Sequence, residues 1–203
     1  MKRPLLLLLL TSGMLTAIGQ TAVAQTVYMD SLQSWRKNYV KTHEILKTPE
    51  DQALLRFYPL NPDYQVQCRF ERTADGDWLR MPTSGPRPLM ARKYGQLTFK
   101  LHDTTLHLFV YQLQFLLAKE ETRNALFVGF TDVTSAADTY GGGRYIDCVI
   151  GDIHDGLLIL DFNKAYNPNC AYTTGFNCPI PPKENDLPVA ILAGEKNYGK
   201  KMH

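Results

Sequence analysis

The spacing of apolar residues in the N-terminal quarter of the chain predicts one amphipathic helix. The apolar residues that recur every three or four positions are Tyr28, Leu32, Trp35 and Tyr39, continuing to Leu46. That interval is the period of a single helix face, and Asp30 or Ser31 can cap the start. We therefore expect a helix over residues 30–47 whose stripe packs on a sheet. Thr48 followed by Pro49 ends it and can begin a short second turn with proline at its first helical position.

From Tyr64 onward the apolar period changes to two, which is the pattern of half-buried β-strands. Residues 96–101 and 106–113 predict a hairpin, and its second strand is the more central because it is apolar on nearly both faces. Residues 73–92, rich in glycine and proline, predict a long loop. The predicted strands are residues 64–71, 96–101, 106–113, 126–130, 145–150, 157–163 and 187–192.

This order of elements predicts the fold class. The strands are connected by loops alone, so we expect a mainly β protein, α+β by count. The expected architecture is an antiparallel β barrel or sandwich with an N-terminal amphipathic helix, and not a parallel α/β sheet. No internal repeat, low-complexity segment or linker divides residues 25–203, which predict a single mostly β domain.

Residues 1–24 have the pattern of a cleavable signal peptide. Lys2 and Arg3 precede a leucine-rich apolar run, and the small residues of the Ala22-Val23-Ala24 segment are suited to cleavage after Ala24. The alternative is an uncleaved membrane anchor, but polar residues and glycine interrupt the run before it reaches the roughly 18 to 20 apolar residues of a membrane span. No cysteine precedes Cys68, so lipidation next to the cleavage site has no acceptor. We expect an exported protein, periplasmic or secreted, with no stable membrane anchor after cleavage.

Cleavage would also change the charge balance. The 203-residue chain has 22 basic and 20 acidic residues. Removing residues 1–24 takes away Lys2 and Arg3 and no acid, which leaves the two kinds of charge equal. A nucleic-acid or anionic-membrane partner then has no electrostatic rationale, and we expect no nucleic acid as a partner.

The four cysteines all follow the predicted cleavage site. Cys170 and Cys178 enclose a segment rich in turn-forming residues, and an exported chain meets an oxidising compartment, so we predict a disulfide between them. The alternative is two free thiols in a buried loop. Cys68 and Cys148 each lie on the apolar face of a predicted strand, where reduced cysteine is a common small apolar residue. A second disulfide between Cys68 and Cys148 stays open.

Polar and turn-forming residues crowd the C-terminal half in several long phrases. Their sequences are FTDVT, TYGGGRY, DFNKAYNPNCAY, CPIPPKEN and AGEK, at residues 130–134, 139–145, 161–172, 178–185 and 193–196. On these phrases the chain resembles a bacterial family known as domain of unknown function 1684. The resemblance extends weakly to residues 57–66 and 94–99, and it departs at Ala136-Ala137 and at the 102–105 turn, where the family commonly has glycine. It implies no established activity.

The glycine-rich phrase is one candidate for a binding site. Gly141, Gly142 and Gly143 allow positive φ and close backbone approach, so their N–H groups can cradle an anion, with Tyr140 beside them and Arg144 as a fork for carboxylate or phosphate. The alternative is a tight turn or bulge that leads into a strand. The spacing matches no nucleotide-binding loop.

A second candidate is a cluster of polar side chains. Strand alternation puts Asp161 and Asn163 on one face, and Asp147 shares a face with Tyr145 in the preceding strand. A 145–163 hairpin would therefore gather Asp147, Asp161 and Asn163 on one surface, where a polar ligand or a hard cation can bind. The alternative is that these groups hydrogen-bond nearby loop backbone.

Several kinds of chemistry lack their motifs. None of the serines after the signal peptide lies in a G-x-S-x-G elbow, and the five histidines lack zinc-site spacing. A Cys170 or Cys178 nucleophile would lose its thiol if the two pair. We therefore predict no catalytic residues, no metal site and no cofactor.

Two functions remain as hypotheses. The first is a non-catalytic exported protein that binds a small polar or anionic ligand, or an envelope partner, through Arg144 and the glycine loop. The alternative is a hydrolase or lyase that acts on envelope material, with Asp147, Asp161 or Glu184 as general acid or base, which needs two of them in one cleft. A purely structural role is the third option.

Overall fold

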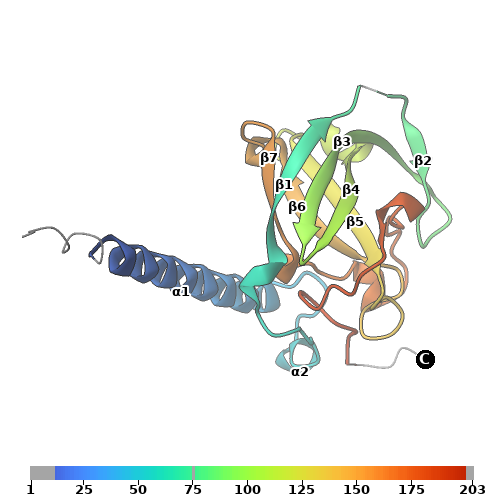
Figure 1. The fold of residues 1–203 in the computed structure, drawn as a ribbon. Coiled ribbons are helices and arrows are strands. Elements are labelled where there is room, and N and C mark those ends of the chain that lie inside the picture. The colour runs from blue at the N-terminus through green and yellow to red at the C-terminus, as the bar shows by residue number, and fades with distance from the viewer. Residues whose placement is uncertain (1–11, 75, 200–203) are drawn as a thin grey trace, which may run out of the picture.

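The computed structural model describes residues 12–74 and 76–199 as a curled antiparallel sheet with a long helix at one end (Figure 1). Residues 1–11, which carry the positive end and much of the apolar run of the predicted signal peptide, lie outside the described residues. Among the described residues, no helix combines the length and the apolar character that crossing a membrane requires.

Eight strands form one sheet. Six of them follow the order β6-β5-β4-β3-β1-β7, with β2 paired to β3 and β8 paired to β5. Among the strand pairings of the described residues, only the short β5–β8 pairing is parallel. The strands are β1 (Gln65–Arg72), β2 (Leu79–Met81), β3 (Leu89–Leu101), β4 (Thr104–Leu113), β5 (Ala125–Asp132), β6 (Arg144–Val149), β7 (Leu157–Asp161) and β8 (Asp186–Leu187). The sheet curls into a half-barrel (Figure 1), which confirms the predicted mainly β, antiparallel fold with an N-terminal helix.

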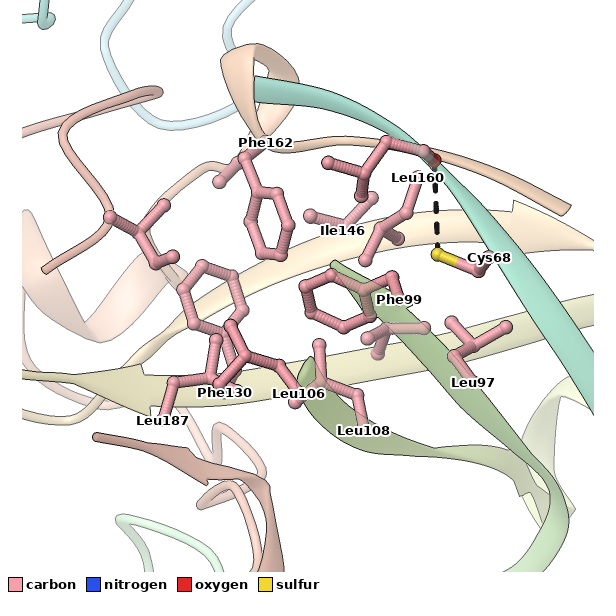
Figure 2. Packing of buried hydrophobic residues seen from close by; sticks show 14 of the residues in the cluster. Cys68, Leu97, Phe99, Leu106, Leu108, Phe130, Ile146, Leu160, Phe162 and Leu187 are labelled. Atoms are coloured by element: carbon pink, nitrogen blue, oxygen red, sulfur yellow. Dashed lines mark hydrogen bonds between the residues drawn. The ribbon is translucent and has the colours of Figure 1, made fainter. Parts of the chain in front are cut away.

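Alternation along the strands places the core on the concave side of the sheet. In β1 the side chains of Val66 and Cys68 are buried while their neighbours are exposed, as the period of two predicts. Figure 2 shows Phe99, Phe130 and Phe162 turned toward one another, with centroid distances of 5.7 Å from Phe162 to Phe99 and 5.4 Å to Phe130. Strands distant in sequence therefore share the main apolar core. A smaller cluster of buried residues contains Tyr111, Phe127 and Tyr145.

The predicted hairpin is present, but the predicted loop before it contains strands. β3 pairs with β4 from Ala91 to Leu101, with a register shift between Lys93 and Gly95, through a tight turn where His102 has a φ of 51°. The predicted loop at 73–92 is wrong in part, because β2 and the start of β3 lie within it and pair with each other. Their pairing register depends on partners distant in sequence, which local composition does not reveal.

Helix α1 (Ser12–Lys41) carries the predicted stripe, with Leu32 fully buried, but it begins well before the predicted start at Asp30 or Ser31 and ends six residues earlier than predicted. The helix therefore continues through the predicted cleavage site at Ala24. After Lys41 the chain turns, because Nδ1 of His43 accepts hydrogen bonds from the backbone N–H groups of Ile45 and Leu46, both at 3.2 Å. The short helix α2 (Pro49–Gln52) follows, capped by the Thr48 side chain as expected. The helical spacing of Leu46 therefore arises from a turn and not from a continuous helix.

The C-terminal half contains less regular structure than predicted. β6 and β7 do not form a hairpin: β6 pairs with β5 and β7 pairs with β1, at opposite ends of the strand order. In place of the predicted strand at 187–192, the structure has β8, a strand of two residues. Short 3-10 helices are Pro62–Tyr64, Gln114–Ala118, Ile150–Asp152, Phe162–Lys164, Asn169–Ala171 and Lys183–Asn185.

Candidate functional site

A cavity of about 850 Å³ lies between the two end strands of the half-barrel. β6 and β7 form two of its walls, and the end of α1 with the turn after it forms a third. The irregular segments 164–169 and 176–179 complete the lining. The cavity thus occupies the seam that the strands leave open.

Aromatic rings line one side of this cavity in a continuous row. Trp35 and Tyr39, one helical turn apart on α1, stack at 5.4 Å between ring centroids. Tyr39 contacts Tyr166 at 6.3 Å, and Tyr166 meets Tyr145 edge-on at 5.9 Å. Tyr145 and Tyr166 also exchange backbone hydrogen bonds of 2.9 and 3.0 Å, which fixes their rings against β6. The row joins α1 to the open edge of the sheet.

Two of the predicted ligand-binding carboxylates reach this cavity. The Tyr166 hydroxyl donates a hydrogen bond of 2.9 Å to Asp147, and burial within the cavity walls raises the pKa of Asp147 although that hydrogen bond lowers it. Asp161 accepts hydrogen bonds from the Tyr28 hydroxyl at 3.1 Å and from the Asn163 backbone at 3.0 Å. Asp147 and Asp161 therefore lie in one cavity although their strands are not paired as predicted.

The third member of the predicted cluster supports the chain instead of facing the cavity. Asn163 is fully buried. Its Oδ1 accepts a hydrogen bond from the Asn61 N–H at 3.0 Å, and its Nδ2 donates to the Asn61 carbonyl at 2.8 Å. Asn163 thus hydrogen-bonds loop backbone, which was the alternative stated for this polar cluster.

Arg144 lies in the protein interior, where 1% of the residue is exposed. Nη1 donates to the carbonyls of Ala193, at 2.5 Å, and Glu195, at 3.3 Å. Nη2 donates to the Ile191 carbonyl at 3.0 Å and to the Asp132 carboxylate at 3.3 Å. The guanidinium therefore holds the C-terminal segment and is not exposed at the surface as the anion hypothesis requires.

The glycine phrase forms the turn that leads into β6. Gly143 has a φ of 86°, and its N–H donates to the Tyr140 carbonyl at 3.1 Å. A Cβ at Gly143 would lie 2.7 Å from both the Phe130 carbonyl oxygen and the Pro181 ring, so only glycine fits. Tyr140, Gly141, Gly142 and Gly143 do not line the cavity that contains Asp147 and Asp161.

Behind the aromatic row lies a buried carboxyl that the sequence did not single out. Glu195 accepts hydrogen bonds from the hydroxyls of Tyr39, at 3.0 Å, and Tyr172, at 2.6 Å, and from the Asn167 N–H at 3.0 Å. Burial raises the pKa of Glu195 to about 7 against the lowering effect of these hydrogen bonds. Glu195 anchors Tyr39 from behind the cavity wall.

The predicted disulfide is present, and the open question of a second one is answered. Cys170 and Cys178 form a disulfide that closes the segment flanking the cavity. Cys68 and Cys148 are free and buried, and burial raises the pKa of each thiol to about 12. At neutral pH both are protonated and poor nucleophiles. Among residues 12–74 and 76–199, no three His, Cys, Asp or Glu side chains gather closely enough to hold a metal ion.

Sequence reasoning missed four residues of this region: Tyr39, Tyr166, Asn167 and Glu195. Tyr39 was read as part of the core-facing stripe, and its hydroxyl was the signal that its surroundings are partly polar. Tyr166 and Asn167 lie in the phrase at 161–172, where the neighbouring residues indicated a turn. Nothing local distinguishes Glu195 from a surface acid.

Comparison with known proteins gives a family and a fold. The model of the family described as "Protein of unknown function (DUF1684)" matches residues 51–196. The chain is 29% identical to an uncharacterized protein of Haloarcula marismortui with a solution NMR structure; the match covers 88% of this chain and 96% of that one, with a TM-score of 0.63. None of the curated proteins matches the chain.

Replacing Arg144 by leucine should lower the free energy of unfolding by about 3 to 5 kcal/mol, because Asp132 would remain charged and buried without its partner. Urea denaturation measures the loss. Arg123→Leu, which removes an exposed ion pair with Glu120, is the matched control and should change stability by less than about 1 kcal/mol. If Arg144→Leu does not fold, Arg144→Lys should fold with a smaller loss. Equal stability of the Arg144 and Arg123 variants would contradict the structural role.

Replacing Glu195 by glutamine should remove a pH dependence of stability. The pKa of about 7 in the folded protein exceeds the unfolded value of about 4.3, so the Glu195 contribution is complete below pH 4.3 and is lost as pH rises through 7. Between pH 5 and 8, wild type should lose about 2 kcal/mol relative to Glu195→Gln in urea denaturation. Glu184→Gln is the control, because ion pairing with Lys93 lowers the Glu184 pKa and moves its titration below this range. Parallel pH curves for wild type and Glu195→Gln would contradict the assignment.

Proposed function

The chain belongs to the DUF1684 family of proteins of unknown function, and for this member we propose that the cavity at the seam of the half-barrel binds a small polar ligand without transforming it. The observation that carries the proposal is the aromatic row that continues to Asp147 through the Tyr166 hydroxyl. Flat apolar rings beside a few oriented polar groups are the usual composition of small-molecule sites.

The size and location of the cavity support this proposal. Ligand pockets usually enclose about 300 to 1,000 Å³, and the volume of about 850 Å³ falls within that range. The walls come from the helix, both end strands and a disulfide-closed segment, so several fixed elements hold the lining in position. A binding site with fixed walls loses little entropy when a ligand is bound.

The proposal moves the ligand from Arg144 and the glycine loop to the seam. The Arg144 guanidinium already donates to three carbonyls and to Asp132 in the interior. Asp147 and Asp161 are the predicted residues that we assign to ligand contact, with Asn163 holding Asp161 in position.

The second candidate is a hydrolase or lyase that uses aspartate carboxylates as general acid or base. Asp147 and Asp161 line one cavity, and desolvation by the cavity walls raises the pKa of Asp147, although the residue is exposed at the cavity surface. Glu184 has no part in this candidate, because it binds Lys93 at 2.8 Å and accepts the Tyr111 hydroxyl hydrogen bond outside the cavity. Binding ranks first, since the hydroxyls of Tyr166 and Tyr28 already donate hydrogen bonds to the two carboxylates.

We also propose that the protein works outside the cytoplasm. The signal-peptide pattern of residues 1–24 supports export, and the Cys170–Cys178 disulfide is the kind of bond that an oxidising compartment maintains.

A thermal-shift screen of amines, organic acids, phosphates and sugars tests the binding proposal. A ligand present at about 100 times its Kd should stabilise the protein by about 2.7 kcal/mol, and Asp147→Asn should weaken that response. Asp103→Asn, in the exposed β3–β4 turn, is the matched control and should respond as wild type. Each stabilising compound is then recovered and weighed by mass spectrometry. Conversion by wild type but not by Asp147→Asn would favour the enzyme, and no stabilising compound at all would contradict both.

Expression of all 203 residues in a Gram-negative host tests export. We expect protein from the periplasmic fraction to begin at Gln25 by intact mass, and to contain two thiols, Cys68 and Cys148, that react only after unfolding. A signal-less version kept in the cytoplasm is the control for the disulfide. Recovery of the uncleaved chain in the membrane fraction would contradict the processing proposal.

A further inference from the structure

We infer that the seam cavity selects organic cations, ligands that present a primary or quaternary ammonium group to the aromatic row and to Asp147. The inference rests on the proposed binding function and names its ligand class. Three independent properties of the lining support it: its charge, its ring faces and its unsatisfied hydrogen-bond acceptor.

The charge of the lining favours a cation. Its carboxylates are Glu44, Asp147, Asp152 and Asp161, against Lys164 as the one lysine or arginine among the lining residues. His43 adds no positive charge at neutral pH, because burial lowers its pKa and its Nδ1 accepts backbone hydrogen bonds. An anionic ligand would meet a field of its own sign, whereas a cation is attracted.

The ring faces provide the second support. The negative face of an aromatic ring attracts ammonium groups, and sites for quaternary ammonium are often built from several such rings. Tyr166 lies between Tyr39 and Tyr145 in the row, with centroid distances of 6.3 and 5.9 Å. Its hydroxyl donates to Asp147, so the ring and the carboxylate that would neutralise an ammonium group are adjacent.

The third support is the balance of hydrogen-bonding groups. The hydroxyls of Tyr39, Tyr145 and Tyr166 donate to Glu195, to the Pro179 carbonyl and to Asp147, so the row offers no free hydroxyl donor. Asn167, which lines the cavity and is 1% exposed, has an Oδ1 with no hydrogen-bond partner among the described residues. The tyrosine hydroxyls therefore leave this acceptor without a donor, and a protonated primary amine supplies one.

A pair of isosteres tests the inference without any mutation. Choline and its neutral carbon analogue 3,3-dimethyl-1-butanol have the same shape and differ in charge. In titrations followed by ¹H–¹⁵N NMR on the purified protein, we expect choline and ethanolamine to shift cavity signals and the neutral analogue to bind at least about tenfold more weakly. Choline should bind more weakly at high salt.

Variants identify the residues that make the selection. Asp147→Asn should weaken choline binding by about tenfold, and Tyr166→Leu should do so as well by removing the central ring. Asp103→Asn is the control, and circular dichroism checks that each variant is folded. If a variant does not fold, the isostere comparison still decides the question.

The outcomes separate the ligand class from the proposed function. Equal affinity for choline and its neutral analogue, or binding of a sugar or an organic acid but of neither amine, would overturn the cation inference and leave the cavity as a binding site. Absence of binding by every probe would overturn the proposed function itself.

Discussion

The C-terminal half of the molecule depends on the hydrogen bonds that the buried Arg144 guanidinium donates. A guanidinium carries five N–H donors in a fixed plane, and here two of its nitrogens serve the carbonyls of residues 191, 193 and 195 and the Asp132 carboxylate. Asp132 in turn accepts a hydrogen bond of 2.7 Å from the Ile191 N–H. An irregular segment that could not satisfy its own backbone is thereby held against the sheet, and Glu195 is brought behind the cavity wall.

The need of irregular backbone for hydrogen-bond partners also explains why this half of the chain is polar in sequence yet buried in the structure. Buried backbone groups need partners, and asparagine, which both donates and accepts, can serve a loop or a strand edge. Asn185 accepts from the Phe109 N–H at 2.7 Å and donates to the carbonyls of Phe109 and Gly129. Asn163 serves residue 61 in the same way. The phrases on which the family resemblance rests are therefore largely the means by which irregular backbone is packed.

The sequence predicted what depends on local period and composition, and missed what depends on pairing and charge burial. Alternation located β1 and the second half of β3, apolar runs located β4, β5, β6 and β7, and the expected oxidising compartment with the turn-rich segment located the disulfide. These patterns could not reveal that β6 and β7 end the sheet, because strand order is set by contacts distant in sequence. Arg144 was read as exposed since charged residues are almost never buried unless paired, and its partners lie 12 to 51 residues away. Asp147 and Asp161 do line one cavity, but the hairpin that was expected to bring them together does not form.

The open seam of the half-barrel links the fold to the candidate site. A sheet that does not close leaves strand edges that must be covered. Here Tyr166 pairs with the backbone of Tyr145 in β6, while Tyr39 on α1 contacts Tyr166. Covering the seam in this way directs the tyrosine hydroxyls to protein acceptors, and it leaves the tyrosines and two predicted carboxylates together in the cavity lining. The proposed preference for a cation rests on this arrangement, because the tyrosine hydroxyls that close the barrel already donate to protein acceptors while four carboxylates remain in the lining.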